Sequence, residues 1–196
     1  KKITINNQGT FSSSFENLNN GLYNFIHLPE FQYLIINKGD SLVFRLNSLD
    51  FDESLVFSGL GASKNNYLID VFLEHEKEEN YIKSKYKSSK IEFKKIIDSL
   101  KNIKTKHYSN YKSVIKTNFI SDLIINHAML IPLYSHIENF IILNKENHTK
   151  NIQYFKKYRD KIDLNISELS HFKPYLDYIT LKSINESFSL DKGYDY

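Results

Sequence analysis

The stretch Gly59-Leu60-Gly61-Ala62-Ser63-Lys64-Asn65-Asn66-Tyr67-Leu68 divides the 196-residue chain into two parts of different character. Before it, short alternating apolar runs are separated by turn residues about every 8 to 12 positions, which is typical of antiparallel strands. After it, glycine and proline become rare and apolar residues recur at spacings of three and four, which indicates helices. Strands followed by helices predict an α+β fold. We expect an antiparallel β module over residues 1–60 and an α-helical domain over residues 61–196.

The β module is predicted to be a sheet or small sandwich of six short strands. The expected strands are Lys1 to Ile5, Phe11 to Phe15, Leu22 to Leu28, Phe31 to Ile36, Leu42 to Asn47 and Ser54 to Ser58. Asn19-Asn20-Gly21 predicts a hairpin turn, because asparagine and glycine tolerate positive φ.

The second part is predicted to form a helical bundle. The expected helices are Asn65 to Asn80, Ser89 to Lys116, Phe119 to Asn144, Tyr154 to Ile162 and Ser167 to Leu190. The third of these is apolar nearly all round, so it should be central, and Pro132 should kink or split it. Polar residues such as Asp122 and Glu138 interrupt it, and a membrane span needs about 20 predominantly apolar residues. It therefore predicts a buried core helix and no membrane span.

Composition excludes several classes of function. The chain has no cysteine, so it cannot contain a disulfide scaffold, a thiolate metal site, a cysteine nucleophile or a redox pair. Its net charge is +3, and arginine occurs only at Arg45 and Arg159. Arginine is the residue that most often hydrogen-bonds to bases and binds phosphates through two N–H groups at once. Because arginine is so scarce, nucleic acid is not expected as a partner.

Two local patterns resemble known sites and lack their essential residues. Gly59 to Lys64 lies between a strand and a helix, where a phosphate-binding turn would sit. Lys64 replaces the third glycine of the dinucleotide pattern and no P-loop ending is present, so a structural turn is favoured. Glu74 to Glu79 superficially resembles a zinc-binding helix, but Glu79 stands where His-Glu-x-x-His needs its second histidine. A solvated helix face is predicted there.

No catalytic, cofactor-binding or metal-binding residue is predicted. Four histidines in helical segments are expected to be hydrogen-bonded core or boundary residues: His107, His127, His136 and His171. The strip Tyr154-Phe155-Lys156-Lys157-Tyr158 and the sheet face with Tyr23, Phe25 and His27 suggest a ligand or glycan surface, although half-buried packing is the commoner role of such residues.

Several short motifs follow one another in the first 70 residues. They are Gly9-Thr10-Phe11-Ser12, Gly21-Leu22-Tyr23, Leu34 to Leu42 with Gly39-Asp40, Leu49 to Gly59 with Asp50-Phe51-Asp52-Glu53, Gly61-Ala62, and Asn65-Asn66-Tyr67-Leu68. This order resembles the N-terminal region of TlpA/ResA-like thiol-disulfide oxidoreductases of Gram-negative bacteria. In that family a sheet module and a helical region lead into a C-terminal thioredoxin domain. Phe172-Lys173-Pro174-Tyr175-Leu176 is similar to the proline-tyrosine segment of the helical region.

The resemblance implies a non-catalytic module. The family's thioredoxin domain needs Trp-Cys-x-x-Cys, and this chain has neither tryptophan nor cysteine, so no catalytic residue is transferred. The resemblance implies a location in the periplasm or cell envelope, with a signal peptide that is not in this chain. It is also compatible with a lipid anchor upstream of this chain. The implied partners are a C-terminal thioredoxin domain outside this chain and protein clients, without a cofactor. The alternative is a stand-alone periplasmic or surface module that binds a ligand or glycan.

The residues of these motifs also have structural interpretations. Gly39-Asp40 is expected to close a hairpin, Phe51 to pin a bend to the core, and Asn65 to cap the first helix. The residues predicted to matter in this way are Gly39, Asp40, Phe51, Asp52, Gly59, Gly61, Asn65, Asn66 and Tyr67.

Overall fold

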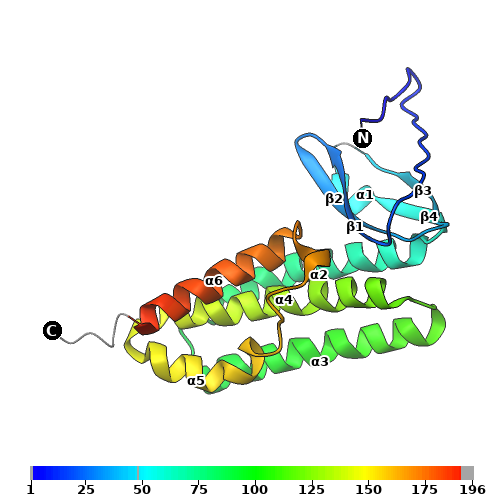
Figure 1. The fold of residues 1–196 in the computed structure, drawn as a ribbon. Coiled ribbons are helices and arrows are strands. Elements are labelled where there is room, and N and C mark those ends of the chain that lie inside the picture. The colour runs from blue at the N-terminus through cyan, green and yellow to red at the C-terminus, as the bar shows by residue number, and fades with distance from the viewer. Residues whose placement is uncertain (1, 48, 191–196) are drawn as a thin grey trace.

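The chain forms a small β module at one end of a helical bundle, as the computed structural model shows for residues 2–47 and 49–190 (Figure 1). The predicted α+β class is confirmed. The β module contains β1 (Gly21–His27), β2 (Glu30–Ile36), β3 (Ser41–Arg45), α1 (Phe51–Ser54) and β4 (Val56–Leu60). The bundle contains α2 (Ala62–Ser84), α3 (Lys90–Val114), α4 (Phe119–Leu143), η1 (Lys145–Asn147), α5 (His148–Arg159), η2 (Ser167–Leu169) and α6 (Lys173–Leu190).

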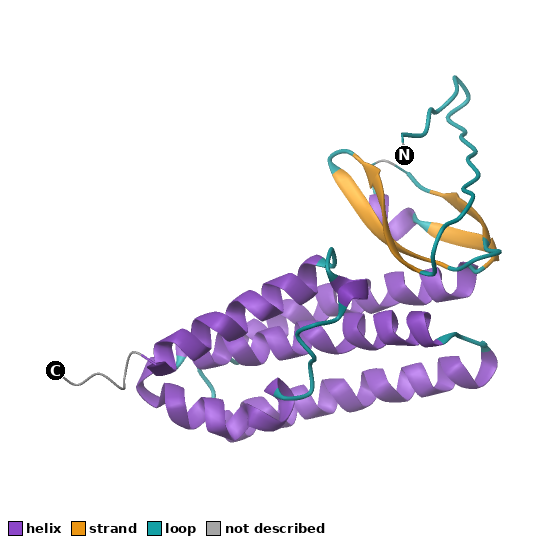
Figure 2. Cartoon of the chain, in the orientation of Figure 1, coloured by secondary structure: helices purple, strands orange, loops and turns teal. Residues whose placement is uncertain are grey.

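The described strands form two separate antiparallel hairpins (Figure 2). In the first, β1 pairs with β2 from Gly21–Ile36 to His27–Glu30, and Leu28-Pro29 makes the turn through a cis peptide bond. In the second, β3 pairs with β4 around the short helix α1. The prediction that Asn19-Asn20-Gly21 closes a hairpin is therefore wrong, because Gly21 begins β1 instead.

Two of the six expected strands are missing from the described residues 2–20. The Asn6 side chain holds a local turn there, accepting hydrogen bonds from the N–H groups of Gln8 and Thr10. Phe11 then packs against Phe25 and Phe44 of the two hairpins, with ring centroids 6.0 and 5.3 Å away. Alternating apolar residues were not enough for a strand, because a strand also needs a partner for its backbone groups.

The two hairpins enclose a small apolar cluster. Its buried members are Leu34, Leu55, Phe57 and Ile69, with Ile69 supplied by α2. Phe51 of α1 is 5% exposed and stacks on Phe25, so it anchors the segment between β3 and β4 as the sequence predicts.

α4 is the central helix of the bundle and contacts α2, α3, α5 and α6. It runs unbroken through Pro132, so the expected split does not occur. A proline inside a helix costs about 3 kcal/mol. Burial offsets this cost, because α4 presents buried apolar side chains on nearly every side, among them Ile124, Ile131 and Ile141.

The β module is attached to the C-terminal helices as well as to α2. His171 donates from Nε2 to the carbonyl oxygen of Leu22 at 2.9 Å. The N–H of Lys173 donates to the Tyr33 hydroxyl at 2.9 Å, and the Tyr33 ring packs on Phe172. None of the described helices combines the length and apolar character that crossing a bilayer requires.

Candidate functional site

The first turn of α2 joins the two hairpins. Gly61 is the N-cap of α2, and Asn65 lies inside the helix, so the prediction that Asn65 caps it is wrong. The Asn65 side chain instead binds β2: the Ile35 N–H donates to Oδ1 at 2.7 Å, and Nδ2 donates to the Ile35 carbonyl at 2.9 Å. Asn65 is 1% exposed, so this amide pair is part of the core.

Asn66 makes the same contact with the other hairpin. The Phe57 N–H donates to Asn66 Oδ1 at 2.8 Å, and Nδ2 donates to the Phe57 carbonyl at 2.9 Å. Successive side chains on a helix point in different directions, so the two asparagines reach β2 and β4 respectively. Each asparagine side chain hydrogen-bonds a backbone N–H and C=O that would otherwise be free to pair with an additional strand. The asparagine pair therefore keeps the hairpins apart and fixes both to α2.

A buried ion pair lies beside this junction. Lys64 Nζ is 2.5 Å from Asp40 Oδ2, and the two side chains are 7% and 9% exposed. The N–H of Asn37 also donates to Asp40, so the Asp40 carboxylate bonds an amide of its own turn. The turn itself does not close a hairpin, because it links β2 to β3 of the other sheet. A Cβ on Gly61 would lie 2.4 Å from Asp40, which explains the glycine.

The structure thus brings together most of the motif residues singled out in the sequence. Asp40, Gly59, Gly61, Asn65 and Asn66 lie around the start of α2. The backbone of Asp52 belongs to α1, and its side chain lies outside the described residues. Tyr67 points away from this junction toward α3, where it stacks on Tyr111 at 4.4 Å.

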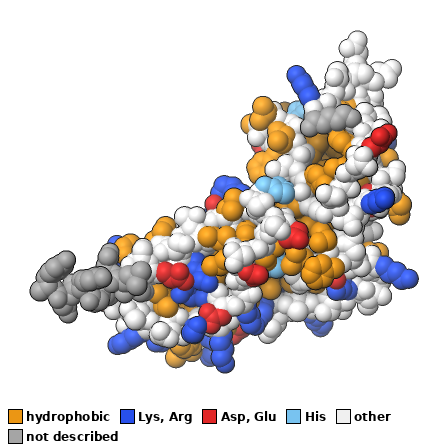
Figure 3. Space-filling view, viewed as in Figure 1, with side chains coloured by type: hydrophobic (Ala, Val, Ile, Leu, Met, Phe, Trp, Pro, Cys, Tyr) orange, Lys and Arg blue, Asp and Glu red, His pale blue; other side chains and the backbone are white. Residues whose placement is uncertain are grey.

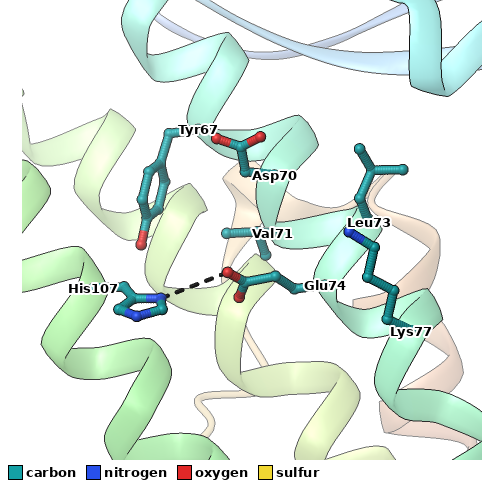
Figure 4. A pocket seen from close by; sticks show the side chains of 7 residues that line it. All are labelled: Tyr67, Asp70, Val71, Leu73, Glu74, Lys77 and His107. Atoms are coloured by element: carbon teal, nitrogen blue, oxygen red, sulfur yellow. Dashed lines mark ion pairs between the residues drawn. The ribbon is translucent and has the colours of Figure 1, made fainter.

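An open pocket of about 350 Å³ lies between α2 and α3 (Figure 4). Its lining consists of Tyr67, Asp70, Val71, Leu73, Glu74, Lys77 and His107. Tyr67 and Glu74 point toward His107, whose Nδ1 is 3.6 Å from Glu74 Oε1. Burial, followed by the charge of Glu74, raises the pKa of Tyr67 to about 12, so its hydroxyl keeps its proton at neutral pH. Burial, followed by Glu74, also raises the pKa of Asp70.

Lys104 neutralises the acidic side chains beneath this pocket. Its Nζ is 3.2 Å from Glu74 Oε2 and 2.9 Å from Glu78 Oε2, and its side chain is 1% exposed. The predicted solvated face at Glu74 to Glu79 is wrong at His75 and Glu78, whose side chains are 12% and 21% exposed, whereas Glu74 is 39% exposed at the pocket. Lys104 could have been anticipated, because it follows Ile97 by seven residues and so shares its apolar face.

His75 is held neutral in this region. It is bonded through Nε2 to the Ala128 carbonyl at 3.2 Å. Burial, followed by the charge of Lys104, lowers the pKa of His75 to about 3. A neutral imidazole with its Nε2 proton committed to a backbone carbonyl is a structural group.

The other histidines are dispersed. His127 bonds the Leu123 carbonyl of its own helix, His136 bonds the Tyr86 hydroxyl, and His171 bonds Leu22. These three have the hydrogen-bonded partners that the sequence predicts. His107 is half exposed, with Glu74 as its partner.

A second buried polar cluster connects α4, α5 and α6. Arg159 Nε donates to Glu138 Oε1 at 2.8 Å, and Asn185 Nδ2 donates to Glu138 Oε2 at 2.7 Å. His148 Nε2 is 2.9 Å from Asn185 Oδ1. Glu138 is 0% exposed, so this cluster is enclosed by protein and gives a ligand no access.

Among the side chains that the structure describes, no three His, Asp or Glu are placed to hold a metal ion. The His107–Glu74 pair has no serine or threonine nucleophile lining its pocket. The first turn of α2 holds the two hairpins at a fixed position on the bundle.

Comparison of the chain with protein-family models, with curated proteins and with solved structures found no match. The resemblance to the TlpA/ResA-like N-terminal region therefore stays a prediction from the sequence.

Proposed function

We propose that this chain is a non-catalytic interaction module of a periplasmic thioredoxin-like, TlpA-type disulfide reductase, where it positions the redox domain or binds its protein partners. The observation that supports this proposal best is the apolar surface of the two hairpins, which α2 holds at the end of the bundle (Figure 3).

The first apolar group lies at the turn of β1 and β2, and we call it the tip patch: Ile26, Leu28 and Phe31. Ile26 and Phe31 are cross-strand partners, and Leu28 belongs to the turn between the strands. Their exposed fractions are 62%, 83% and 43%. Exposed apolar side chains grouped in this way favour contact with another protein.

The second apolar group lies on the outer face of β3 and β4, and we call it the ladder patch: Val43, Val56 and Leu60. Val43 is paired with Ser58, so Val56 and Leu60 are its diagonal neighbours on the same face. All three are at least 60% exposed. The inner face of the same ladder, with Phe44 and Phe57, packs on the cluster between the hairpins.

The features that motivated a ligand or glycan surface are mostly covered. Phe25 is half-buried against the rings of Phe11 and Phe44, and His27 stacks on Phe51 at 6.4 Å. In the Tyr154 to Tyr158 strip, Phe155 is 0% exposed and Tyr158 is 7% exposed. These aromatic side chains act as packing groups, which favours the interaction module over the ligand-binding alternative.

The first test is the reading frame downstream of Tyr196. The proposal expects a Trp-Cys-x-x-Cys motif within about 100 residues, roughly one domain length. A frame without such a domain would overturn the link to a reductase.

The second test measures binding of this chain to that redox domain by titration calorimetry. Val43→Ser combined with Val56→Ser should weaken binding tenfold or more, as should Ile26→Ser combined with Phe31→Ser, if the patches form the contact. The matched control is Ile91→Ser with Ile103→Ser on α3, whose side chains are 55% and 47% exposed. Equal binding by all variants would contradict the role of the hairpins.

A further inference from the structure

A second pocket lies at the other end of the bundle from the β module's junction, where α3 begins beside the end of α4. Its volume is about 240 Å³. Its lining consists of Ser88, Ser89, Lys90, Phe140, Asn144, Asn147 and Asn151, and no acidic side chain is among them. We call it the Asn151 pocket.

Asn151 is the unusual member of this set. It is 3% exposed, yet its side chain makes no hydrogen bond to any part of the chain that the structure describes. The amide atoms themselves are not sealed in protein but keep contact with solvent at the pocket, where an entering group can reach them. The amide of Asn144 differs, because its Nδ2 donates to the carbonyls of Tyr86 and Phe140. Asn151 therefore offers two free N–H donors to whatever enters the pocket.

The start of α3 supplies positive potential at the same place. α3 has 25 residues, and its N-cap Ser89 accepts a hydrogen bond from the N–H of Glu92. The amides of the first turn, at Lys90 and Ile91, have no acceptor within the helix, and the helix dipole adds partial positive charge.

Lys90 adds a full positive charge at the pocket. Its Nζ lies 5.0 Å from the centre of the Tyr154 ring on α5. Tyr154 and Asn151 are three residues apart on α5, so they share the face that meets the start of α3. The cation, the unbonded amide and the helix terminus thus come together from two different helices.

We propose that the Asn151 pocket binds a small oxyanion, namely a phosphate or sulfate group, either as the free ion or as the head of a small organic ester. A tetrahedral oxyanion accepts hydrogen bonds on every side, which suits several donors with no competing carboxylate. The inference is independent of the interaction module, because the pocket shares no residue with either hairpin patch.

The experiment is a titration of the full chain with inorganic phosphate, sulfate and glycerol phosphate, followed by amide NMR at constant ionic strength with chloride as the reference. Saturable shifts are expected at the backbone amides of Ser89 and Lys90 and at the side-chain amide of Asn151. Tighter binding of glycerol phosphate than of inorganic phosphate identifies an organic ester, and the reverse identifies the free ion. Glycerol itself should give no shift.

Two substitutions test the assignment. Asn151→Asp keeps the shape and replaces the donors with an acceptor, and it should weaken phosphate binding by at least about tenfold, as expected for losing hydrogen bonds to a charged group. Lys90→Gln should weaken it to a smaller extent. The matched control is Lys95→Gln, an exposed lysine of the same helix outside the pocket. Shifts that do not saturate, that are equal with chloride, or that persist in Asn151→Asp would overturn the proposal.

Discussion

The Asn65 side chain satisfies both backbone polar groups of Ile35, a residue 30 positions earlier in the chain. Asn65 is 1% exposed and Ile35 is 0% exposed, so water does not replace these bonds if they are lost. Asn66 repeats the contact at Phe57 in a less buried position. The start of α2 is therefore the point at which the stability of the β module depends on the bundle.

Removing the Asn65 amide should destabilise the protein strongly. Asn65→Ala leaves a buried N–H and a buried carbonyl of Ile35 without partners, which we expect to cost about 2 to 4 kcal/mol of unfolding free energy. Asn66→Ala should cost less, about 1 to 2 kcal/mol, because its contacts are only partly buried. Urea unfolding followed by circular dichroism measures both.

The matched control for the asparagine variants is Asn80→Ala, an exposed asparagine of the same helix. It should be neutral or slightly stabilising, because alanine favours helix. Equal effects at Asn65 and Asn80 would contradict the role of the amide pair.

Alanine substitutions at Gly59 and Gly39 distinguish the cost of a steric clash from the cost of the left-handed backbone conformation. Their φ angles are 89° and 88°, but a Cβ on Gly59 would lie 2.3 Å from the Ser41 carbonyl oxygen, whereas one on Gly39 meets nothing within 4 Å. Gly39→Ala should cost about 1 to 2 kcal/mol, from the left-handed conformation alone. Gly59→Ala should cost about 2 kcal/mol more, because β3 must move. Thermal unfolding of the two variants gives the comparison, and equal values would refute it.

The buried pair of Glu138 and Arg159 should behave as a unit. Glu138→Leu removes the buried partner of Arg159 and leaves it only the more distant, exposed Glu186 at 3.5 Å, which should cost about 3 kcal/mol. Glu138→Leu with Arg159→Met should recover most of that loss, because no buried charge is left and Asn185 Nδ2 still donates to the backbone carbonyl of residue 138. A double-mutant cycle in urea measures the coupling.

The control for that cycle is the exposed pair Lys156 and Asp160, whose side chains are 63% and 55% exposed. Its removal should leave the unfolding free energy unchanged within error. A coupling as large at Lys156–Asp160 as at Glu138–Arg159 would show that burial is not the cause.

Stability should fall on mild acidification because of His75 and His136. Burial, the largest cause in each case, lowers the pKa of His75 to about 3 and that of His136 to about 4. In the unfolded chain a histidine has a pKa near 6.5, so below about pH 6.5 the unfolded state binds protons that the folded state does not. The stabilisation is complete above that pH and is lost progressively as the pH falls toward 4 and then 3, by up to about 1.4 kcal/mol per pH unit for each histidine.

The measurement is the unfolding free energy in urea between pH 5 and pH 8. His75→Gln and His136→Gln should each reduce the slope below pH 6.5, whereas above pH 7 each variant should run parallel to the parent chain. A slope that neither substitution alters would assign the acid sensitivity to other groups.

Local patterns predicted α3 and α4 well, but they placed the start of α5 six residues too late and that of α6 six residues too early. The apolar spacing of three and four placed α3 and α4 within a few residues of their bounds, and the apolar character of α4 indicated its central position. This information is local, because each helix satisfies its backbone groups within its own segment. The same reasoning failed for the first 20 residues, since alternation alone does not say whether a neighbouring strand is present to pair with.

The sequence by itself determined the α+β class, the order of strands before helices, and the exclusion of cysteine chemistry from this chain. It marked Asp40, Asn65 and Asn66 as motif residues, but their partners were decided only by the tertiary structure. Lys64, Ile35 and Phe57 each lie on a different element from the side chain they meet, at separations of 24, 30 and 9 residues. The Asn151 pocket likewise exists only where the start of α3, the end of α4 and α5 meet. Contacts between elements depend on which surfaces are buried together, and no local period in the chain encodes that pairing.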